Sequence, residues 1–415
     1  MAKNIPEIVD QYAEEAAFLW LLRDSAVSAH HYLLTDLARL DSRVSAHLDG
    51  LRSEGKAAWK VLESGLEIGE PGEVFAAGLL AFESGDAEWI QKVVKLGAAK
   101  PDTCRALISA LGWLPFEAVS SDIKMLLSSD SSSLRRIGIA ASAIHRKNPG
   151  AAALQSAFAS DDPCLKARAL RAAGELGLVD LQLTLRANLK AKEPAIRFWA
   201  AWSTALLGGH KDALAALQDV AEAPGPLAAR ATTLLIRRLP LRDARAWLFK
   251  LVKELKRHRV AVVAAGALGD ADAVPWLIDQ MKVPAMARVA GEAFSMITGA
   301  HIAYNKLEAQ KPEGFESGPT EDPNDDNVAL DPDEHLSWPD PALVKKWWEG
   351  HRGEFAKDTR YLLGKPITPE SLREALLNGY QRQRAAAALE LAILNPGKPL
   401  FEVRAPGFVQ RKSLS

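Results

Sequence analysis

Residues 165–177, LKARALRAAGELG, decide the fold, because their pattern returns along the chain. The segments 196–208, IRFWAAWSTALLG, and 258–269, HRVAVVAAGALG, are again rich in alanine and again end at glycine. Five such phrases end between Gly177 and Gly299, at steps of 31, 31, 30 and 30 residues. Self-similarity at this period is typical of stacked helix pairs rather than of a single closed core.

Polar residues recur in the same register. An earlier alanine-rich phrase ends at Arg146, 31 residues before Gly177. Five of the six phrase ends are preceded, eleven residues earlier, by a basic residue or histidine, and the first two are preceded by an aspartate sixteen residues earlier. We expect each basic side chain to bind an acid or a turn carbonyl of the adjacent repeat, with a basic stripe for an anionic ligand as the alternative. This predicted ladder consists of Arg135, Lys166, Arg197, His258 and Arg288, with Asp130 and Asp161 as its acids.

Composition and charge divide the chain into four parts. Residues 1–100 read as an N-terminal helical cap with net charge −6, and 101–301 as the repeat array with net charge +8. Residues 302–341 form an acidic Pro/Gly-rich loop with net charge −9. Residues 342–415, with net charge +6, are predicted as a C-terminal helical unit with a short terminal strand over 400–404. The sequence therefore predicts an all-α solenoid with an N-terminal cap and a small C-terminal unit after the loop.

The composition, net charge and cysteine count of the chain indicate the broad class of protein. With 48% hydrophobic and 25% charged residues, most of the 415-residue chain is expected to fold. A formal net charge of −1 gives no global attraction to nucleic acid or acidic membranes. The two cysteines, Cys104 and Cys164, are too few for a disulfide framework. The sequence contains neither a signal-peptide pattern at its start nor a run of 18 apolar residues, so we expect a cytoplasmic protein without a membrane span.

These features resemble a known repeat family. The period, the alanine-rich second helix and the ladder are similar to short HEAT repeats, of the phycobilisome-lyase type, over 101–301. The amino-acid sequence outside the repeats resembles that of a proteobacterial HEAT-like family whose genes tend to lie in type VI secretion clusters with spike and effector genes. That resemblance implies a cytoplasmic accessory role in loading or assembly, and it carries over no catalytic residue. It rests on segments such as FLWLLRD at 18–24, GEVFAA at 72–77, RVAGEAF at 288–294, WPDP at 338–341 and QRQRAA at 381–386.

No motif indicates catalysis. The chain has no His-Glu dipeptide, the pair with which HEAT-like deoxyhypusine hydroxylases bind iron. His30 and His31 are adjacent, and adjacent helical residues point about 100° apart, which disfavours joint chelation of one metal ion. Phosphate-binding glycine loops, serine elbows and Cys/His nucleophile pairs are also missing. We therefore predict no enzyme activity, no cofactor and no metal, with an enzyme of unrecognised site as an open alternative.

The acidic loop partly fits a calcium-binding motif. Asp322 to Asn327, followed by Asp333, places acids or amides at ligand positions 1, 3, 5 and 12. However, Asn327 replaces the glycine that the sharp turn needs, so we favour a solvated loop.

The leading prediction is a non-enzymatic scaffold, adaptor or chaperone that binds a protein, with a secretion effector or spike component implied by the resemblance. Tryptophan and arginine dominate the binding hot spots of protein interfaces, so residues of these two types outside the repeats are the candidate contacts. For Trp347 and Trp348 the alternative role is burial against the solenoid. A nucleic-acid-binding solenoid is the runner-up, which the 18 acids within the array disfavour. We also expect the acidic loop to fold back on the basic array or to recruit a basic partner. The protein-binding candidates are Trp347, Trp348, Arg382 and Arg384.

Overall fold

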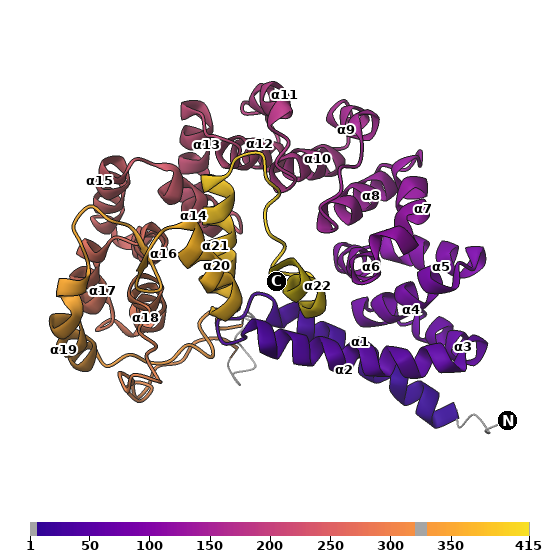
Figure 1. Ribbon diagram of the computed structural model, residues 1–415, viewed down its shortest axis with the longest axis horizontal. Coiled ribbons are helices and arrows are strands. Elements are labelled where there is room, and N and C mark those ends of the chain that lie inside the picture. The colour runs from indigo at the N-terminus through magenta and orange to yellow at the C-terminus, as the bar shows by residue number, and fades with distance from the viewer. Residues whose placement is uncertain (1–5, 320–329, 415) are drawn as a thin grey trace. The chain divides into compact units, whose positions relative to one another are not determined.

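The computed structural model describes residues 6–319 and 330–414. In these residues the chain forms 22 α-helices, four short 3-10 helices and one pair of two-residue strands, which confirms the predicted all-α class (Figure 1). Two compact units are present. Unit 1 comprises residues 1–207 and 396–415, and unit 2 comprises 208–395.

Unit 1 is a stack of helix pairs. Helices α4, α6, α8, α10 and α12 pack against one another in succession, and α5, α7, α9 and α11 each pack against the helix that follows (Figure 1). Helix α1 packs on α2 and α4, and the C-terminal α22 packs on α2. The helices are α1 Pro6–Ala26, α2 Leu34–Glu54, α3 Lys56–Gly65, α4 Pro71–Ser84, α5 Ala87–Gly97, α6 Pro101–Trp113, α7 Phe116–Leu127, α8 Ser132–Ile144, α9 Ala151–Phe158, α10 Pro163–Glu175, η1 Val179–Leu181, α11 Gln182–Ala187, α12 Pro194–Leu206 and α22 Gly407–Leu414.

Unit 2 continues the same design. Helices α14, α16 and α18 pack in succession, α13, α15 and α17 pack against them, and the α20–α21 pair lies beside α14. A small antiparallel hairpin pairs Tyr361 with Pro366. The elements are α13 Lys211–Glu222, α14 Ala228–Arg238, α15 Leu241–Val252, η2 Leu255–Arg257, α16 His258–Leu268, η3 Ala271–Ala273, α17 Val274–Gln280, α18 Pro284–Thr298, α19 Pro341–His351, η4 Arg352–Glu354, β1 Tyr361–Leu362, β2 Lys365–Pro366, α20 Pro369–Asn378 and α21 Gln381–Leu394.

Small residues set the spacing within both stacks, as the alanine-rich phrases predict. A Cβ atom built on Gly174 of α10 would lie 2.5 Å from Ser203 Oγ of α12. Likewise, a Cβ on Gly266 of α16 would lie 2.9 Å from Ala293 of α18. Both distances are shorter than real Cβ contacts, so these helices approach as closely as they do because glycine faces the neighbour. Larger side chains here would push the stacked helices apart.

Local capping fixes where several helices begin. Asp86 caps α5 by accepting from the backbone N–H groups of Glu88 and Trp89. Asp162 caps α10 in the same way, and Pro163 follows in the first turn, where its missing N–H is not needed. These caps hold the register of the polar side chains along each helix.

Candidate binding site

Unit 1 contains a cavity of about 310 Å³ lined by arginines, which we call the arginine pocket. Its walls come from α1, α6, α8, α10 and the C-terminal segment 396–407. Six arginines and three acidic residues line it, so its lining has an excess of positive charge. The arginines are Arg23, Arg105, Arg136, Arg168, Arg171 and Arg404, and the acids are Asp24, Glu175 and Glu402.

Helix stacking brings these side chains together. Arg168 and Arg171 are three residues apart on α10 and so lie on one face of that helix. Arg136 lies on α8, Arg105 near the start of α6 and Arg23 in the last turn of α1. Each of four neighbouring helices therefore contributes at least one guanidinium.

Glu175 neutralises two of the arginines. Its carboxylate lies 2.9 Å from Arg168 Nη1 and 2.7 Å from Arg171 Nε, and its side chain is only 7% exposed. Burial alone would raise the pKa of Glu175, but the charges of Arg168 and Arg171 outweigh it and lower the pKa to about 2. Burial also lowers the pKa of Arg168, which Glu175 opposes. The acid thus stays ionised and holds both arginines in place.

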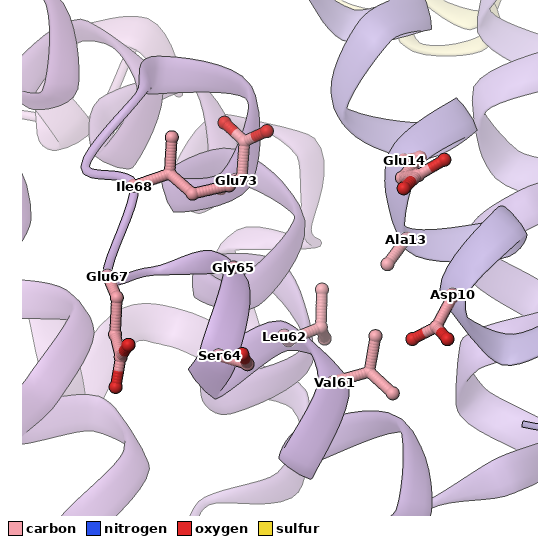
Figure 2. Close-up of a pocket in the computed structure, with 10 residues that line it drawn as sticks. All are labelled: Asp10, Ala13, Glu14, Val61, Leu62, Ser64, Gly65, Glu67, Ile68 and Glu73. Atoms are coloured by element: carbon pink, nitrogen blue, oxygen red, sulfur yellow. The ribbon is translucent and has the colours of Figure 1, made fainter.

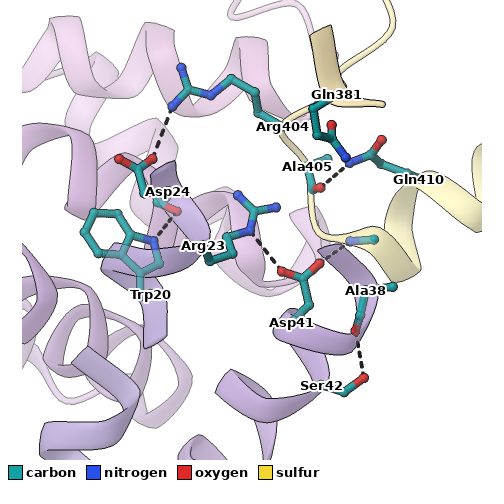
Figure 3. A network of polar contacts seen from close by, with 12 residues as sticks. Trp20, Arg23, Asp24, Ala38, Asp41, Ser42, Gln381, Arg404, Ala405 and Gln410 are labelled. Carbon is teal, nitrogen blue, oxygen red and sulfur yellow. Dashed lines mark hydrogen bonds and ion pairs between the residues drawn. The ribbon is translucent and has the colours of Figure 1, made fainter. Parts of the chain in front are cut away.

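A second polar group joins α1, α2 and the C-terminal segment (Figure 3). Arg23 Nε donates to Asp41 at 2.9 Å, and the other oxygen of Asp41 accepts from the backbone N–H of Gly407. Asp24 pairs with Arg105 and, at 3.2 Å, with Arg404. Arg23 is 3% exposed, yet its Nη2 has no hydrogen-bond partner. A buried guanidinium nitrogen without a partner is a costly arrangement that a bound acceptor would relieve.

Arg136 is the least neutralised arginine of the pocket. Its Nη2 donates to Cys104 Sγ at 3.7 Å, whereas its Nε is buried without a partner. Among the described residues no carboxylate lies within ion-pair distance of Arg136. The pKa of Asp162 is lowered mainly by a hydrogen bond from Ser132, and the charge of Arg136 makes a smaller contribution. Burial raises the pKa of the Cys104 thiol, so this cysteine stays neutral.

The C-terminal segment runs as an extended peptide along the pocket. Leu400 N–H donates to Glu175 O at 2.9 Å, and Arg146 donates to Leu400 O. Arg146 also pairs with Glu402 at 3.1 Å. The predicted strand at 400–404 is wrong: the segment is extended and then turns, because its backbone bonds to helix ends and arginines instead of a second strand.

The residues of the predicted ladder differ in their partners, and two of the five basic ones, Arg197 and His258, bond to nearby backbone. Arg197 donates to Ala191 O, in the turn before α12, at 3.3 Å, and His258 Nε2 lies 2.9 Å from Val252 O, at the end of α15. Arg135 donates to Ser156 Oγ at 2.7 Å. In the described part of the chain the side chain of Lys166 makes no hydrogen bond or ion pair, and the same holds for the side chains of the two predicted acids, Asp130 and Asp161, which are exposed. The acid that acts at this position is the neighbouring Asp162, as the cap of α10.

In unit 2 acids of the loop neutralise two arginines of the stack. Arg259 of α16 donates two hydrogen bonds to the carboxylate of Asp333, at 2.8 and 2.6 Å. Arg288, the last ladder residue, is buried, pairs with Asp331 at 2.7 Å and lies 4.6 Å over the ring of Trp338. The described end of the acidic loop therefore contacts the array, as the charge pattern predicts.

The four predicted protein-binding residues all belong to unit 2. Trp348 is 9% exposed and packs on Phe355, so it serves burial. Trp347 is partly buried, stacks on His351 and meets Phe294 edge to face.

The two predicted arginines differ in exposure. Arg382 pairs with Glu292 at 2.9 Å. Arg384 is fully buried and donates to Leu376 O, so in this structure its guanidinium is not presented to a partner. Of the four predicted residues, Trp347 and Arg382 keep the most accessible polar or aromatic surface.

An acidic cavity of about 590 Å³ lies on the N-terminal helices of unit 1 (Figure 2). Asp10 and Glu14 come from α1, Glu67 from the turn after α3 and Glu73 from the first turn of α4. The view shows the four carboxylates on separate parts of the wall. Across the described residues no group of three or more His, Cys, Asp or Glu is arranged to hold a metal ion.

The remaining sequence motifs add no site. The rings of His30 and His31 meet edge to face at 4.9 Å. Most of the partial calcium motif, including Asp322 and Asn327, lies outside the described residues, and its last member Asp333 binds Arg259.

Comparison with protein-family models finds no matching family, and comparison with curated proteins finds no similar sequence. Among the helices of residues 6–319 and 330–414, none combines the length and apolarity that a membrane span requires. The arginine pocket, which is built from residues up to 381 positions apart in sequence, is the site that the sequence patterns missed.

Proposed function

We propose that the protein is a non-enzymatic scaffold whose unit 1 binds an acidic segment of a protein partner along the arginine pocket. The observation that carries this proposal is the docking of the C-terminal segment. An extended peptide is already held there through a backbone hydrogen bond to Glu175 O and through Arg146, which binds both Leu400 O and Glu402. A partner peptide with carboxylates would use the same kinds of contact.

The charge of the pocket favours an anionic partner. Arg105 and Arg404 keep 48% and 43% of their side-chain surface exposed while sharing Asp24. Two accessible guanidiniums beside one carboxylate leave hydrogen-bond donors for an added acid. Arginines of this kind act as anchors in protein interfaces.

The resemblance stated above adds a candidate for the partner. If the chain acts as that HEAT-like family is expected to act, the partner is a component of type VI secretion, such as an effector or spike protein, and binding takes place in the cytoplasm. A nucleic-acid-binding solenoid is less well supported, since most arginines of both units pair with carboxylates of the chain itself.

The test compares capture of partners by three full-length proteins: wild type, Arg105→Glu in the pocket and Arg186→Glu on the exposed face of α11. Tagged protein is incubated with native cell extract, with and without nuclease, and captured proteins are identified by mass spectrometry. We expect an acidic partner to be captured stoichiometrically by wild type and Arg186→Glu and to be lost with Arg105→Glu. The proposal would be contradicted if Arg105→Glu captured as much partner as wild type does, or if capture were lost after nuclease treatment.

A further inference from the structure

The arginine pocket has more free donors than a single carboxylate can use. Arg23 Nη2 and Arg136 Nε are both buried without hydrogen-bond partners, and they come from different helices, α1 and α8. Figure 3 shows the Nη atoms of Arg23 directed away from Asp41, which occupies only Nε. Exposed donors of Arg105 and Arg404 lie on the same cavity.

The charge balance points the same way. Six arginines face three acids, so one carboxylate leaves an excess of two positive charges in the lining. A phosphate monoester carries about −1.5 to −2 charges at pH 7 and three strong acceptor oxygens, which match several guanidiniums approaching from different directions. The cavity of about 310 Å³ is at the lower end of the range typical of small-molecule sites, roughly 300–1,000 Å³.

We propose that the arginine pocket of unit 1 is a phosphate-binding site that recognises a phosphomonoester, as carried by a phosphorylated serine or threonine of the protein partner. Arg136 and Arg23 would bind phosphate oxygens from the walls of α8 and α1, and Arg404 from the C-terminal segment. Glu175 keeps Arg168 and Arg171 in place below them. The inference rests on the proposed function for its partner, but the pocket and its chemistry can be tested alone.

Isothermal titration calorimetry at 0.15 M salt tests the site with full-length protein and four probes: O-phosphoserine, inorganic phosphate, AMP and glutamate. We expect O-phosphoserine to bind more tightly than glutamate. Arg136→Gln in α8 and Arg404→Gln in the C-terminal segment should each weaken binding about tenfold or more, because hydrogen bonds to charged groups are the strong ones. Arg186→Gln on α11 should leave binding unchanged. Circular dichroism and thermal unfolding verify that each variant is folded. A similar loss of binding in both pocket variants would show that the result does not depend on one substitution.

The pH dependence separates phosphate from carboxylate. None of the described residues that line the pocket is a histidine, the pKa of Glu175 is about 2 and that of Cys104 is raised. The second pKa of a phosphomonoester is about 6, so affinity for O-phosphoserine should rise between pH 5 and 7.5, while affinity for glutamate stays flat.

Each outcome bears on one of the two proposals. Equal, pH-independent binding of O-phosphoserine and glutamate would overturn the phosphate site and leave an acidic-peptide site. Failure of folded protein to bind O-phosphoserine, together with arginine-dependent capture of a partner, would do the same. Binding of O-phosphoserine without any captured protein would support the site and overturn the proposed function. Preference for AMP over O-phosphoserine would assign the phosphate to a nucleotide and overturn recognition of a phosphorylated protein.

Discussion

Unit 1 and unit 2 carry the same kind of arginines on the same kind of stack, but the chain neutralises them differently. In unit 2, Asp331 and Asp333 of the acidic loop occupy Arg288 and Arg259 directly. In unit 1 the C-terminal segment brings one acid, Glu402, and also a further arginine, Arg404. The repeat alone therefore does not determine which arginines are neutralised. Whether a later segment supplies enough carboxylates decides which arginine surface remains available.

The largest effect is expected at Glu175, on which the pocket of unit 1 depends. Glu175→Gln leaves the buried guanidinium of Arg168 without a counter-charge, and breaking a buried pair in this way costs about 3–5 kcal/mol. Urea unfolding, followed by hydrogen exchange in α10, measures the loss. Glu117→Gln, at an exposed site on α7, is the matched control and should change stability by less than about 0.5 kcal/mol. Equal stability of the two variants would show that the pocket is not held by this acid.

Acid titration should separate the two units. The folded-state pKa of Glu175, about 2, lies below its ordinary value of 4.5, so its stabilising contribution is present above pH 4.5 and is lost as the pH falls towards 2. The shift corresponds to about 3 kcal/mol as an order of magnitude. In unit 2, burial raises the pKa of Glu292 despite Arg382, so protonation of Glu292 favours the folded state as the pH falls.

Hydrogen exchange measured separately in α10 and α18 between pH 6 and 3 checks this contrast. We expect protection in α10 to fall with pH in wild type and to fall less in Glu175→Gln. Glu292→Gln should remove the opposing contribution in α18 and leave α10 unchanged. A wild-type α10 whose protection is independent of pH would contradict the assigned shift.

Removing the acids of the loop should make unit 2 resemble unit 1. Asp333→Asn weakens the paired hydrogen bonds to Arg259 and is expected to cost about 1–3 kcal/mol in unit 2, since Asp333 is 4% exposed. It also frees Arg259, so binding of poly-glutamate should rise and should weaken with added salt. Glu334→Gln, at an exposed neighbouring position, controls for loss of one loop charge. If both variants bind poly-glutamate equally, net charge rather than Arg259 is responsible.

The sequence predicted the stack better than the site. The 30–31-residue period and the alanine-rich phrases predict close helix packing, which Gly174 and Gly266 show. The ladder is harder to predict because one residue along a helix turns a side chain by about 100°, so that Arg136, not Arg135, lines the pocket. Asp162, which caps α10, lies next to the predicted ladder acid Asp161.

The rest depends on contacts distant in sequence. The C-terminal segment meets Asp24 and Asp41 across more than 360 residues, which no local pattern encodes. Arg384 illustrates the converse: an arginine that ends the polar run 381–384 is expected to be exposed, but it is buried and bonded to Leu376 O. A single sequence indicates which residue types are available, whereas tertiary packing decides which of them are exposed.

The smallest effect is expected at Trp347. A variant at this residue tests most directly whether the binding surface lies in unit 1 or in unit 2. Trp347 is the most accessible aromatic among the predicted contact residues, and it already stacks on His351 and meets Phe294 edge to face. Trp347→Phe keeps an aromatic ring there, so partner capture should change by less than about fivefold, below the hot-spot threshold of roughly 1 kcal/mol. The measurement is the same capture assay, with Arg105→Glu as the reference for a disrupted surface. A loss of capture with Trp347→Phe as large as with Arg105→Glu would move the binding surface to unit 2, because a conservative change in a ring packed against unit 2 cannot alter the arginine pocket of unit 1.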